Sequence, residues 1–593
     1  MAHDSLDASG LIARYAALHP VAATALGVHD HDGRWGAEGA KGDAAILSWI
    51  DEERTRLERL DATTLSSDDQ VDRDLALATL AAIRFERLEV RPAAWDALHA
   101  ISVVGSGLFP LIARTFGTRE SRARDLLARL RGVGSYLDSA FDALVGVPAL
   151  RVPVDDGAPR PNGGEPPRGE VELPARPISR LHVETAISQA AGIGELAALA
   201  VAEYGEELRA AADAATAAAE RYATRLRDEV LPRSSGEGRF GAPLYDRAIR
   251  HTLFGSHDRA AIAAATTREF DAVRARMVEI ARRAAPQWLG ERAEAAIGAA
   301  GADGGHALVA AVLDAIGADH ASPATLLERC RQETARCEAF VRRTNLVELP
   351  SEPLEIVWTP RFLRAYGGAF LDAPGPLDRG EKSFFYVTPP ADDATPEQIE
   401  SMLREDNNRM LALLAIHEAI PGHYLQLAAA NQSDRPLRAA FGSGVFAEGW
   451  AVYVTQVMLD EGFGEGDDAL ELVHWKFYLR CIANAMLDIG IHAEGRDEAW
   501  AMDLMVSRTW QEESEARAKY LRARLTATQL PTYFVGSMGC WELEDRARGL
   551  TTSHALPGNR ATTPGFSRPA HLKAMLSHGT PPIPLLARLI GAS

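Results

Sequence analysis

Two histidines six positions apart mark the stretch best suited to chemistry. Residues 417–423 read His-Glu-Ala-Ile-Pro-Gly-His. In the related pattern His-Glu-x-x-His, two imidazoles one helical turn apart bind zinc and the intervening Glu is the general base. On an unbroken helix a six-residue spacing puts the imidazoles on different faces, because each residue advances the helix by about 100°. The motif therefore predicts a metal site only if the helix is interrupted between the two histidines.

Pro421 and Gly422 supply such an interruption. A proline has no N–H to donate, and its ring collides with the carbonyl four residues back, here that of His417. Gly422 tolerates a positive φ. A bulge that removes two residues from the helical count would leave a four-residue separation and return both imidazoles to one face. The alternative is a simple helix stop at Ile420, with the histidines on either side of a turn.

Glu448 is the predicted third ligand, since a catalytic zinc site needs at least three protein ligands and an open position for water. It follows the flexible Gly442-Ser443-Gly444 and opens a predicted helix that runs to about Leu459. Such a helix can fold back on the first in an αα hairpin, and Gly449 would let the two backbones approach closely. The alternative is an ordinary acid favoured by a helix N-terminus.

Other side chains are candidates for the reaction itself. Glu418 would take a proton from the attacking water and pass it to the leaving nitrogen. His492 lies in a mainly apolar predicted helix, where a structural core histidine is the alternative. Tyr533 can stabilise the oxyanion of a tetrahedral intermediate, with a buried structural tyrosine as the alternative. A substrate carboxylate could bind to Arg480, Arg522 or Arg524. The sequence does not favour one of the three.

Other sequence patterns give weaker signals. Residues 441–445 lack the G-x-S-x-G spacing of a nucleophile elbow, and there is no Walker loop or G-x-G-x-x-G between a strand and a helix. His29 and His31 alternate with aspartates, which is compatible with a metal loop. We expect a polar turn there instead.

Composition predicts a helical, acidic protein. The chain has 593 residues, of which 47% are apolar, so a substantial core is available. Its richness in Ala, Leu, Arg and Glu favours helices. The formal net charge of -19 argues against a nucleic-acid or anionic-membrane partner, because either needs a basic face. The length fits several domains, or one large helical body with a lobe on either side of a cleft.

The expected location is cytoplasmic. The four cysteines form no CxxC pattern, which fits a reducing compartment. The first residues lack the basic and apolar regions of a signal peptide. No window approaches the roughly 20 apolar residues of a membrane span, so no membrane partner is expected.

The elements that must position the candidate residues are predicted to be mainly helical. Helical periodicity covers residues 8–30, 43–61, 66–89, 119–145, 184–230 and 258–345. The Ala-rich run 184–230 fits either an antiparallel helix pair or one long bent helix. The Pro/Gly-rich segment 146–177 is predicted to be a surface loop, with a domain boundary as the alternative.

A small β element is predicted directly before the metal motif. Residues 353–360 read as a strand bracketed by prolines, which confines it to an edge or end of a sheet. Residues 383–389 are a second strand candidate. Thr395 is a plausible N-cap with Pro396 at the first helical position, and that helix is predicted to continue into His417. By analogy with zinc peptidases, an edge strand here would receive a peptide by β-augmentation.

The motif residues 417–426, together with Glu-Gly-Trp-Ala-Val-Tyr at 448–453, closely resemble the bacterial domain-of-unknown-function 885 family. Its members look like helical zinc metallopeptidases distantly similar to angiotensin-converting enzyme and related gluzincins. The resemblance covers most of the chain, since it extends to residues 15–30, 374–375, 385–387, 487–492 and 532–536.

The resemblance implies roles for particular residues. The implied zinc ligands are His417, His423 and Glu448. The implied catalytic residues are Glu418, His492 and Tyr533. We take Tyr386 and Arg522 as candidate substrate-binding residues. The family's usual Pro-Gly-Gln is replaced here by Ala527-Thr528-Gln529, and many members are exported lipoproteins, whereas no signal peptide is expected from the first residues of this sequence.

These observations predict a mainly α, two-lobed helical zincin-like fold with a small β element before the metal-binding helix. We expect one metallopeptidase domain over 1–593, with lobes of roughly 1–235 and 236–593. The expected activity is Zn²⁺-dependent hydrolysis of short peptides, as an exopeptidase or oligopeptidase. The alternatives are a zinc amidohydrolase acting on a non-peptide amide and a catalytically silent helical peptide-binding protein. The sequence indicates no oligomeric state.

Overall fold

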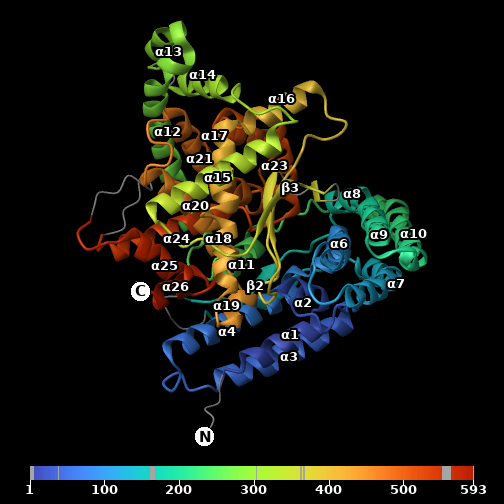
Figure 1. Ribbon diagram of the computed structural model, residues 1–593. Helices are drawn as coiled ribbons and strands as arrows, with labels where there is room; N and C mark the ends of the chain where they lie inside the picture. Colours follow the sequence, from blue (N-terminus) through green and yellow to red (C-terminus); the bar gives the residue numbers. More distant parts are fainter. Residues whose placement is uncertain are drawn as a thin grey trace. The chain divides into compact units, whose positions relative to one another are not determined.

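The protein is mainly α-helical in a computed structural model (Figure 1). The structure describes residues 6–37, 39–160, 167–301, 304–360, 363–364, 368–550 and 563–591. Helices account for 67% of the chain and strands for 5%, which confirms the predicted fold class. The chain forms two compact units. Unit 1 comprises Met1–Gly255, Pro374–Lys382 and Asn431–Gly442, and unit 2 comprises Ser256–Ala373, Ser383–Ala430 and Ser443–Ser593.

Unit 1 is built from short and medium helices with one small hairpin. Its helices are α1 (Ala8–Leu18), α2 (Pro20–Leu26), α3 (Ala40–Glu58), α4 (Ser67–Phe85), α5 (Pro92–Trp95), α6 (Ala97–Ala113), α7 (Arg119–Ala143), α8 (Arg180–Gln189), α9 (Ala191–Tyr204), α10 (Arg209–Arg225), α11 (Ala242–Thr252) and α19 (Pro436–Ala440). Polar residues start several of them. Ser66 caps α4 and Asp96 caps α6 by accepting from backbone N–H groups of the first turn.

Trp35 lies in a slot between α6 and α7 that two glycines create. A side chain at Gly107 would lie 2.5 Å from the indole ring, and one at Gly132 would lie 2.6 Å from it. The indole N–H donates to the Arg129 carbonyl at 3.0 Å. The glycines therefore allow a large aromatic ring to enter where any other residue would exclude it.

The segment predicted as a surface loop contains a two-stranded sheet. Strands β1 (Leu150–Pro153) and β2 (Glu170–Leu173) pair antiparallel, with Leu150 opposite Leu173. Leu173 is buried in an apolar cluster with Phe85 and Leu244. The loop prediction for residues 146–177 missed this hairpin because the few apolar residues that anchor it are separated by prolines and glycines.

The Ala-rich run 184–230 forms parts of three helices rather than one pair or one bent helix. α8 gives way to α9 at Ala190, and α9 ends at Gly205, whose φ of 112 lies in the left-handed region. The stretch Arg180–Tyr204 is long and apolar enough to cross a membrane by length and composition alone, which the sequence analysis did not anticipate. Core helices pass the same test, and Ile193, Leu196 and Val201 are buried within unit 1.

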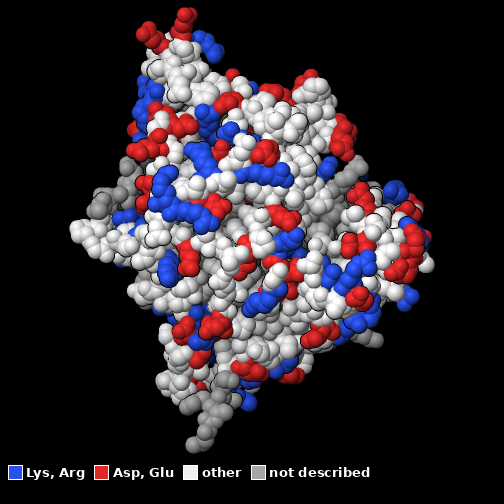
Figure 2. All heavy atoms as spheres, viewed as in Figure 1, with Lys and Arg blue, Asp and Glu red and all other residues white. Residues whose placement is uncertain are grey.

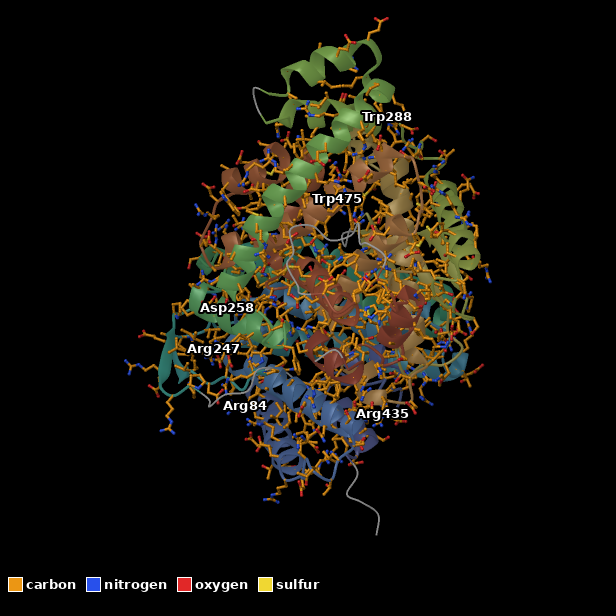
Figure 3. All side chains as sticks on the ribbon, turned by 90° about the vertical axis from the view of Figure 1, so that its left-hand side faces the viewer. Arg84, Arg247, Asp258, Trp288, Arg435 and Trp475 are labelled. Atoms are coloured by element: carbon orange, nitrogen blue, oxygen red, sulfur yellow. The ribbon has the colours of Figure 1, made fainter. Side chains whose placement is uncertain are left out.

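Unit 2 has α-helices of 5 to 31 residues. They are α12 (Arg259–Leu289), α13 (Ala293–Ala299), α14 (His306–Gly317), α15 (Leu326–Thr344), α16 (Pro396–Glu405), α17 (Asn408–Leu414), α18 (His423–Asn431), α20 (Gly444–Asp460), α21 (Asp468–His492), α22 (Glu498–Met502), α23 (Glu513–Leu525), α24 (Pro531–Ala547), α25 (Arg568–Leu576) and α26 (Ile583–Leu589). Figure 3 shows α12 from its N-cap Asp258 to Trp288 near its other end. α21 is buried along nearly its whole length, as expected of a central helix.

Helices α20 and α24 cross at two glycines. A side chain on Gly449 would lie 2.2 Å from the Gly536 carbonyl carbon, so only hydrogen atoms fit between the two backbones. From the sequence, the close approach at Gly449 was expected to be to the helix that carries His417 and His423. The partner is instead α24, which carries Tyr533, so this glycine pair brings the helices of Glu448 and Tyr533 together.

A three-stranded sheet precedes the motif. Strands β3 (Leu354–Trp358), β4 (Ala369–Asp372) and β5 (Ser383–Val387) have the order β3-β5-β4. β3 pairs parallel with β5 and β4 pairs antiparallel with it. The proline-bracketed strand β3 is at an edge, as predicted. β4, at the other edge, was not predicted.

The helix before the motif starts as predicted but is not continuous. Thr395 accepts from Gln398 N in a capping box, with Pro396 at the first position of α16. α16 ends at Glu405, and Asn407 caps a new helix, α17, by accepting from the N–H groups of Arg409 and Met410.

On the face that Figure 2 draws, Lys and Arg side chains are interspersed with Asp and Glu.

Candidate metal centre

The break at Pro421-Gly422 brings the two motif histidines side by side. α17 runs into a single π-helical turn, Ala415–Ala419, that carries His417 and Glu418. The backbone leaves the helix at Ile420, whose φ of -124 and ψ of 118 are extended, and α18 begins at His423. The two imidazole rings lie 4.8 Å apart between centroids. The interruption is thus two helical segments joined by a short turn rather than a bulge within one helix.

Gly422 is required for space rather than for an unusual φ. A side chain there would lie 1.9 Å from the His417 carbonyl oxygen, and its φ is not in the positive region that the sequence analysis expected. The Ile420–Pro421 peptide bond is cis. Trp450 on α20 donates its indole N–H to the Pro421 carbonyl at 2.8 Å. The turn is therefore tied to the helix that carries Glu448.

Glu448 completes a three-residue cluster. Its Oε2 lies 3.3 Å from His423 Nε2 and 3.8 Å from His417 Nε2. One potential ligand atom from each of the three side chains lies within 4.8 Å of the others. Oε2 is buried, and no donor among the described residues makes a well-directed hydrogen bond to it. A buried carboxylate oxygen facing two imidazole nitrogens is suited to a cation between them.

Burial and charge set the protonation of the two imidazoles. Burial lowers the pKa of His417 well below its usual range, and the charges of His423 and Arg480 act in the same direction. For His423, burial again disfavours the charged form, but Glu448 and Glu418 outweigh it and raise the pKa. His417 is therefore neutral, which is the form that binds metals.

Glu418 is held beside the cluster by the edge strand that the sequence analysis missed. The backbone N–H of Leu371 on β4 donates to Glu418 Oε2 at 3.0 Å. Burial raises the pKa of Glu418 to about 7, with the positive charge of His423 lowering it and the negative charge of Glu448 raising it. A carboxyl group with a pKa near neutrality can both accept and release a proton at physiological pH.

Tyr533 lies on the first turn of α24, close to the same cluster. Its ring is 6.5 Å from that of His417, with an interplanar angle of 21°. Its hydroxyl accepts a hydrogen bond from Gln529 Nε2 at 3.3 Å. Burial raises the pKa of Tyr533, the charge of Glu448 raises it further, and Arg522 and Gln529 lower it. The net shift is upward, so the phenol keeps its proton.

His492 is engaged with the backbone. It is buried, and its Nε2 lies 2.7 Å from the Ala523 carbonyl oxygen and 3.0 Å from that of Thr526. A carbonyl only accepts, so this nitrogen carries the proton and donates it. The arrangement is that of a structural core histidine, and the catalytic role of His492 stays a prediction from the family resemblance.

The two candidate substrate-binding residues have different surroundings. Tyr386 on β5 is buried and stacks with Phe384, at 5.6 Å between centroids, and its ring lies 5.4 Å from that of Phe370 on β4 at a tilt of 50°. Arg522 is exposed and donates to Gln529 Oε1 at 3.1 Å. Gln529, which the sequence analysis did not single out, links Arg522 to Tyr533. The sequence feature that could have identified Gln529 is its position at the Gln of the family's usual Pro-Gly-Gln.

The other two arginines are less available to a substrate carboxylate. Arg480 lies 3.5 Å from the buried carboxylate of Glu405, and its guanidinium packs over the Phe477 ring. The guanidinium of Arg524 lies over the ring of Tyr520. Both cations already have neighbours of complementary charge or an aromatic face.

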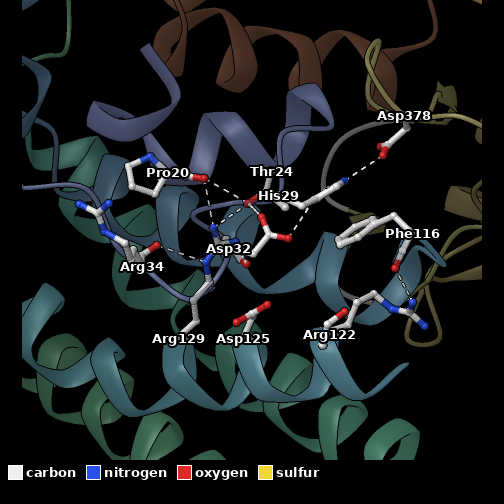
Figure 4. Close-up of polar contacts among 12 residues, drawn as sticks. Pro20, Thr24, His29, Asp32, Arg34, Phe116, Arg122, Asp125, Arg129 and Asp378 are labelled. Carbon is white, nitrogen blue, oxygen red and sulfur yellow. Dashed lines mark hydrogen bonds and ion pairs between the residues drawn. The ribbon is translucent and has the colours of Figure 1, made fainter. Parts of the chain in front are cut away.

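His29 in unit 1 belongs to an ion-pair network (Figure 4). Its Nδ1 lies 2.8 Å from Asp32 and its Nε2 lies 2.9 Å from Asp378. Burial disfavours the charged imidazole, but the two carboxylates raise the pKa of His29 to about 9. Both ring nitrogens are donors, so neither can bind a metal. His31 lies 3.3 Å from Arg34. This is the polar turn that the sequence analysis favoured.

A family profile shows to which protein family the chain belongs. The profile described as "Bacterial protein of unknown function (DUF885)" matches residues 20–590. The chain belongs to the DUF885 family. This confirms the family resemblance found from the motif blocks, and leaves the similarity to gluzincins as an expectation.

Two solved structures share the DUF885 chain's fold. One is a candidate lipoprotein of unknown function from Shewanella oneidensis, with a TM-score of 0.75, 24% identity and 98% coverage of both chains. The other is a candidate lipoprotein from Colwellia psychrerythraea, with a TM-score of 0.73, 14% identity and 98% coverage of both chains. No curated protein matches the chain. The descriptions as lipoproteins differ from the cytoplasmic location expected here, which stays a prediction.

Proposed function

We propose that this DUF885 protein is a zinc-dependent peptidase that hydrolyses short peptides. The observation that carries the proposal is the convergence of His417, His423 and Glu448, with the carboxyl of Glu418 held beside them. Zinc bonds of about 2.0–2.1 Å at tetrahedral angles separate ligand atoms by roughly 3.3 Å. The separations of 3.3 and 3.8 Å around Glu448 Oε2 are close to that value, and the three ligand atoms, which lie within 4.8 Å of one another, would draw together around the ion.

The three ligand side chains would hold the zinc ion, with Trp450 and the Pro421-Gly422 turn fixing their relative positions. A bound zinc ion supplies Lewis acidity, which polarises a carbonyl and lowers the pKa of water. Two imidazoles and one carboxylate leave a coordination position open, as catalytic sites require.

Glu418 would act as the proton carrier. Its Oε2 accepts from Leu371 N, which orients the carboxyl and leaves Oε1 to take the proton of the attacking water. The same oxygen then delivers that proton to the amine of the departing peptide fragment. Tyr533, protonated and near His417, would donate its hydroxyl hydrogen to the oxyanion of the tetrahedral intermediate.

A peptide is the preferred substrate because the site borders a sheet edge. β4 is an edge strand, and its Leu371 lies against Glu418. An extended chain can align with such an edge by backbone hydrogen bonds. That arrangement would present a peptide bond to Glu418 without requiring particular side chains.

The test combines metal content with turnover. Elemental analysis is made on wild type, Glu418→Gln and His423→Ala, with His31→Ala as the histidine control. We expect about one zinc per chain in all but His423→Ala. A mixed short-peptide library is then analysed by mass spectrometry with and without a chelator.

Cleavage by wild type that chelation stops and added zinc restores would support the proposal, provided that Glu418→Gln keeps zinc and loses turnover. Zinc absent even after addition, or full turnover in Glu418→Gln, would refute it. Zinc retained without cleavage of any peptide would leave a silent binding protein or an amidohydrolase, which a non-peptide amide panel separates.

A further inference from the structure

The segment between α23 and α24 is held by two buried side chains one turn apart on α21. His492 donates from Nε2 to the carbonyls of Ala523 and Thr526. Asp488 Oδ2 accepts from Thr528 N at 3.0 Å. A carboxylate acceptor and an imidazole donor thus fix the backbone on both sides of residue 527. The rigid helix α21 therefore determines where residue 529 emerges.

Thr528 has an unusual backbone conformation. Its φ of 65 is in the left-handed region, which is costly for a β-branched residue and is normally occupied by glycine. The bond to Asp488 offsets part of this cost. The next residue, Gln529, starts the turn into α24, and its carbonyl accepts from both the hydroxyl and the N–H of Thr532. The side chain of Gln529 is therefore presented from a fixed backbone.

The orientation of the Gln529 amide follows from its partners. Arg522 donates from Nη2 to Gln529 Oε1 at 3.1 Å, and Gln529 Nε2 donates to the Tyr533 hydroxyl oxygen at 3.3 Å. A guanidinium has no acceptor, so the amide oxygen must face Arg522 and the amide nitrogen must face Tyr533. The phenol oxygen is thereby an acceptor toward Gln529. Its own hydrogen is left for a different acceptor.

We infer that Gln529 is a positioning residue that makes Tyr533 a hydrogen-bond donor toward the metal cluster, with Arg522 fixing the orientation of the amide. The inference rests on the proposed peptidase function, in which that hydrogen meets the developing oxyanion. Tyr533 is well placed for this because its ring lies beside that of His417. The role differs from the sequence-based assignment of Arg522 as a direct substrate ligand.

The variant Gln529→Glu tests the orientation directly. A carboxylate has no donor, so it pairs with Arg522 and accepts the phenol hydrogen, which turns the Tyr533 hydroxyl away from the oxyanion. We expect kcat on a cleaved peptide to fall about 30- to 300-fold with KM changed less than about threefold. Gln529→Met, of similar size without donor or acceptor, should lose less, because the phenol then rotates without a competing acceptor.

A double-mutant cycle distinguishes positioning from general damage. Tyr533→Phe alone should lose about as much kcat as Gln529→Glu, and the double variant should lose no more than either. Additive losses, or wild-type kcat in Gln529→Glu, would overturn the inference. A structural defect would instead lower kcat further in the double variant and lower the melting temperature.

Binding provides a readout that does not depend on turnover. A phosphinic peptide, which mimics the tetrahedral anion, is titrated by calorimetry into zinc-loaded wild type and Gln529→Glu, with a cleavage product as reference ligand. We expect the phosphinic peptide to bind about 30- to 300-fold more weakly to the variant, with product affinity and zinc content unchanged. Equal weakening of both ligands would overturn the inference. A wild type that neither cleaves peptides nor binds the phosphinic peptide would refute the proposed function itself, and this inference with it.

Discussion

Two groups of histidine and carboxylate side chains in this molecule look alike in composition and differ in chemistry. In unit 1, His29 donates from both nitrogens to Asp32 and Asp378 at 2.8 and 2.9 Å. In unit 2, His417 and His423 face Glu448 at 3.8 and 3.3 Å. In the first group both imidazole nitrogens are hydrogen-bonded to carboxylates, and we call it the closed group. In the second, which we call the open group, Glu448 Oε2 accepts no well-directed hydrogen bond from the described residues.

The difference lies in where the positive charge comes from. One imidazole between two carboxylates becomes an imidazolium, and the pKa of His29 rises to about 9. Burial disfavours the charged form of both imidazoles in the second group. Glu448 and Glu418 outweigh it at His423 and raise the pKa of that residue, whereas the pKa of His417 falls well below its usual range. The first group supplies its own cation. In the second group His423, whose pKa Glu448 and Glu418 raise, can carry the charge as a proton, and the metal ion proposed above would take the place of that proton.

The largest expected effect comes from changing the carboxylate in the open group to an amide. Glu448→Gln keeps the size of the side chain but removes the ligand charge. We expect zinc affinity to fall on the order of 1,000-fold, or about 4 kcal/mol, with the fold retained. Competition with a fluorescent zinc chelator measures the change. Asp32→Asn is the matched control and should bind zinc like wild type. Equal losses of zinc affinity in Glu448→Gln and Asp32→Asn would show that the two groups do not differ in metal binding.

The same amide change in the closed group should act on stability instead. Asp32 is buried and accepts from Thr24 Oγ1 at 2.6 Å as well as pairing with His29. Asp32→Asn leaves His29 with one carboxylate and reduces the charge that balances Arg129. We expect the free energy of unfolding to fall by about 3 kcal/mol, measured by urea titration. Asp30→Asn, at an exposed neighbouring position, should change it by less than about 0.5 kcal/mol. A loss of the same size in Asp30→Asn would contradict the assignment.

The pH dependence of stability should report on His29 next. Its pKa is raised from 6.5 to about 9 on folding, so its contribution is fully present below pH 6.5 and is lost as the pH rises through about 9. Because the side chain is 28% exposed, solvent screening reduces the contribution to about 2 kcal/mol. Unfolding midpoints between pH 6 and pH 9.5 measure it. His29→Gln should lose this slope, and an unchanged slope would exclude His29 as its source.

The smallest effect concerns Thr528, which has a strained backbone and follows the segment that His492 binds. His492 belongs to neither of the two groups. Thr528→Gly removes a β-branched side chain at a φ of 65 and keeps the N–H that Asp488 accepts. We expect a gain in stability of about 1 kcal/mol, seen as a rise in melting temperature. Thr532→Gly, at a helical position, should lower stability and serves as the opposite control. A loss of stability in Thr528→Gly would mean that the threonine side chain contributes packing that outweighs the strain.

Local chemistry in the sequence already determined the class of fold and the centre of the site. Helix-favouring composition and periodicity predicted the mainly α structure, and Thr395 with Pro396 marked the start of α16. Flanking prolines put β3 at a sheet edge. The motif 417–423 and Glu448 were found from residue type and spacing alone, because a metal site requires those donors and a break between the histidines.

Contacts between distant segments decided the rest. β4 exists because it pairs with β5, and its short sequence carries little signal of its own. Gly449 packs against Gly536 of α24, a partner 87 positions away that no local rule indicates. His492 holds the 523–526 backbone, and Gln529 meets Tyr533 and Arg522 only after α21, α23 and α24 have packed. Tertiary structure also separated two histidine–carboxylate groups of similar composition, because it set the number of imidazoles and carboxylates that meet in each group and the distances between them, and the second group is the one proposed to bind a metal ion.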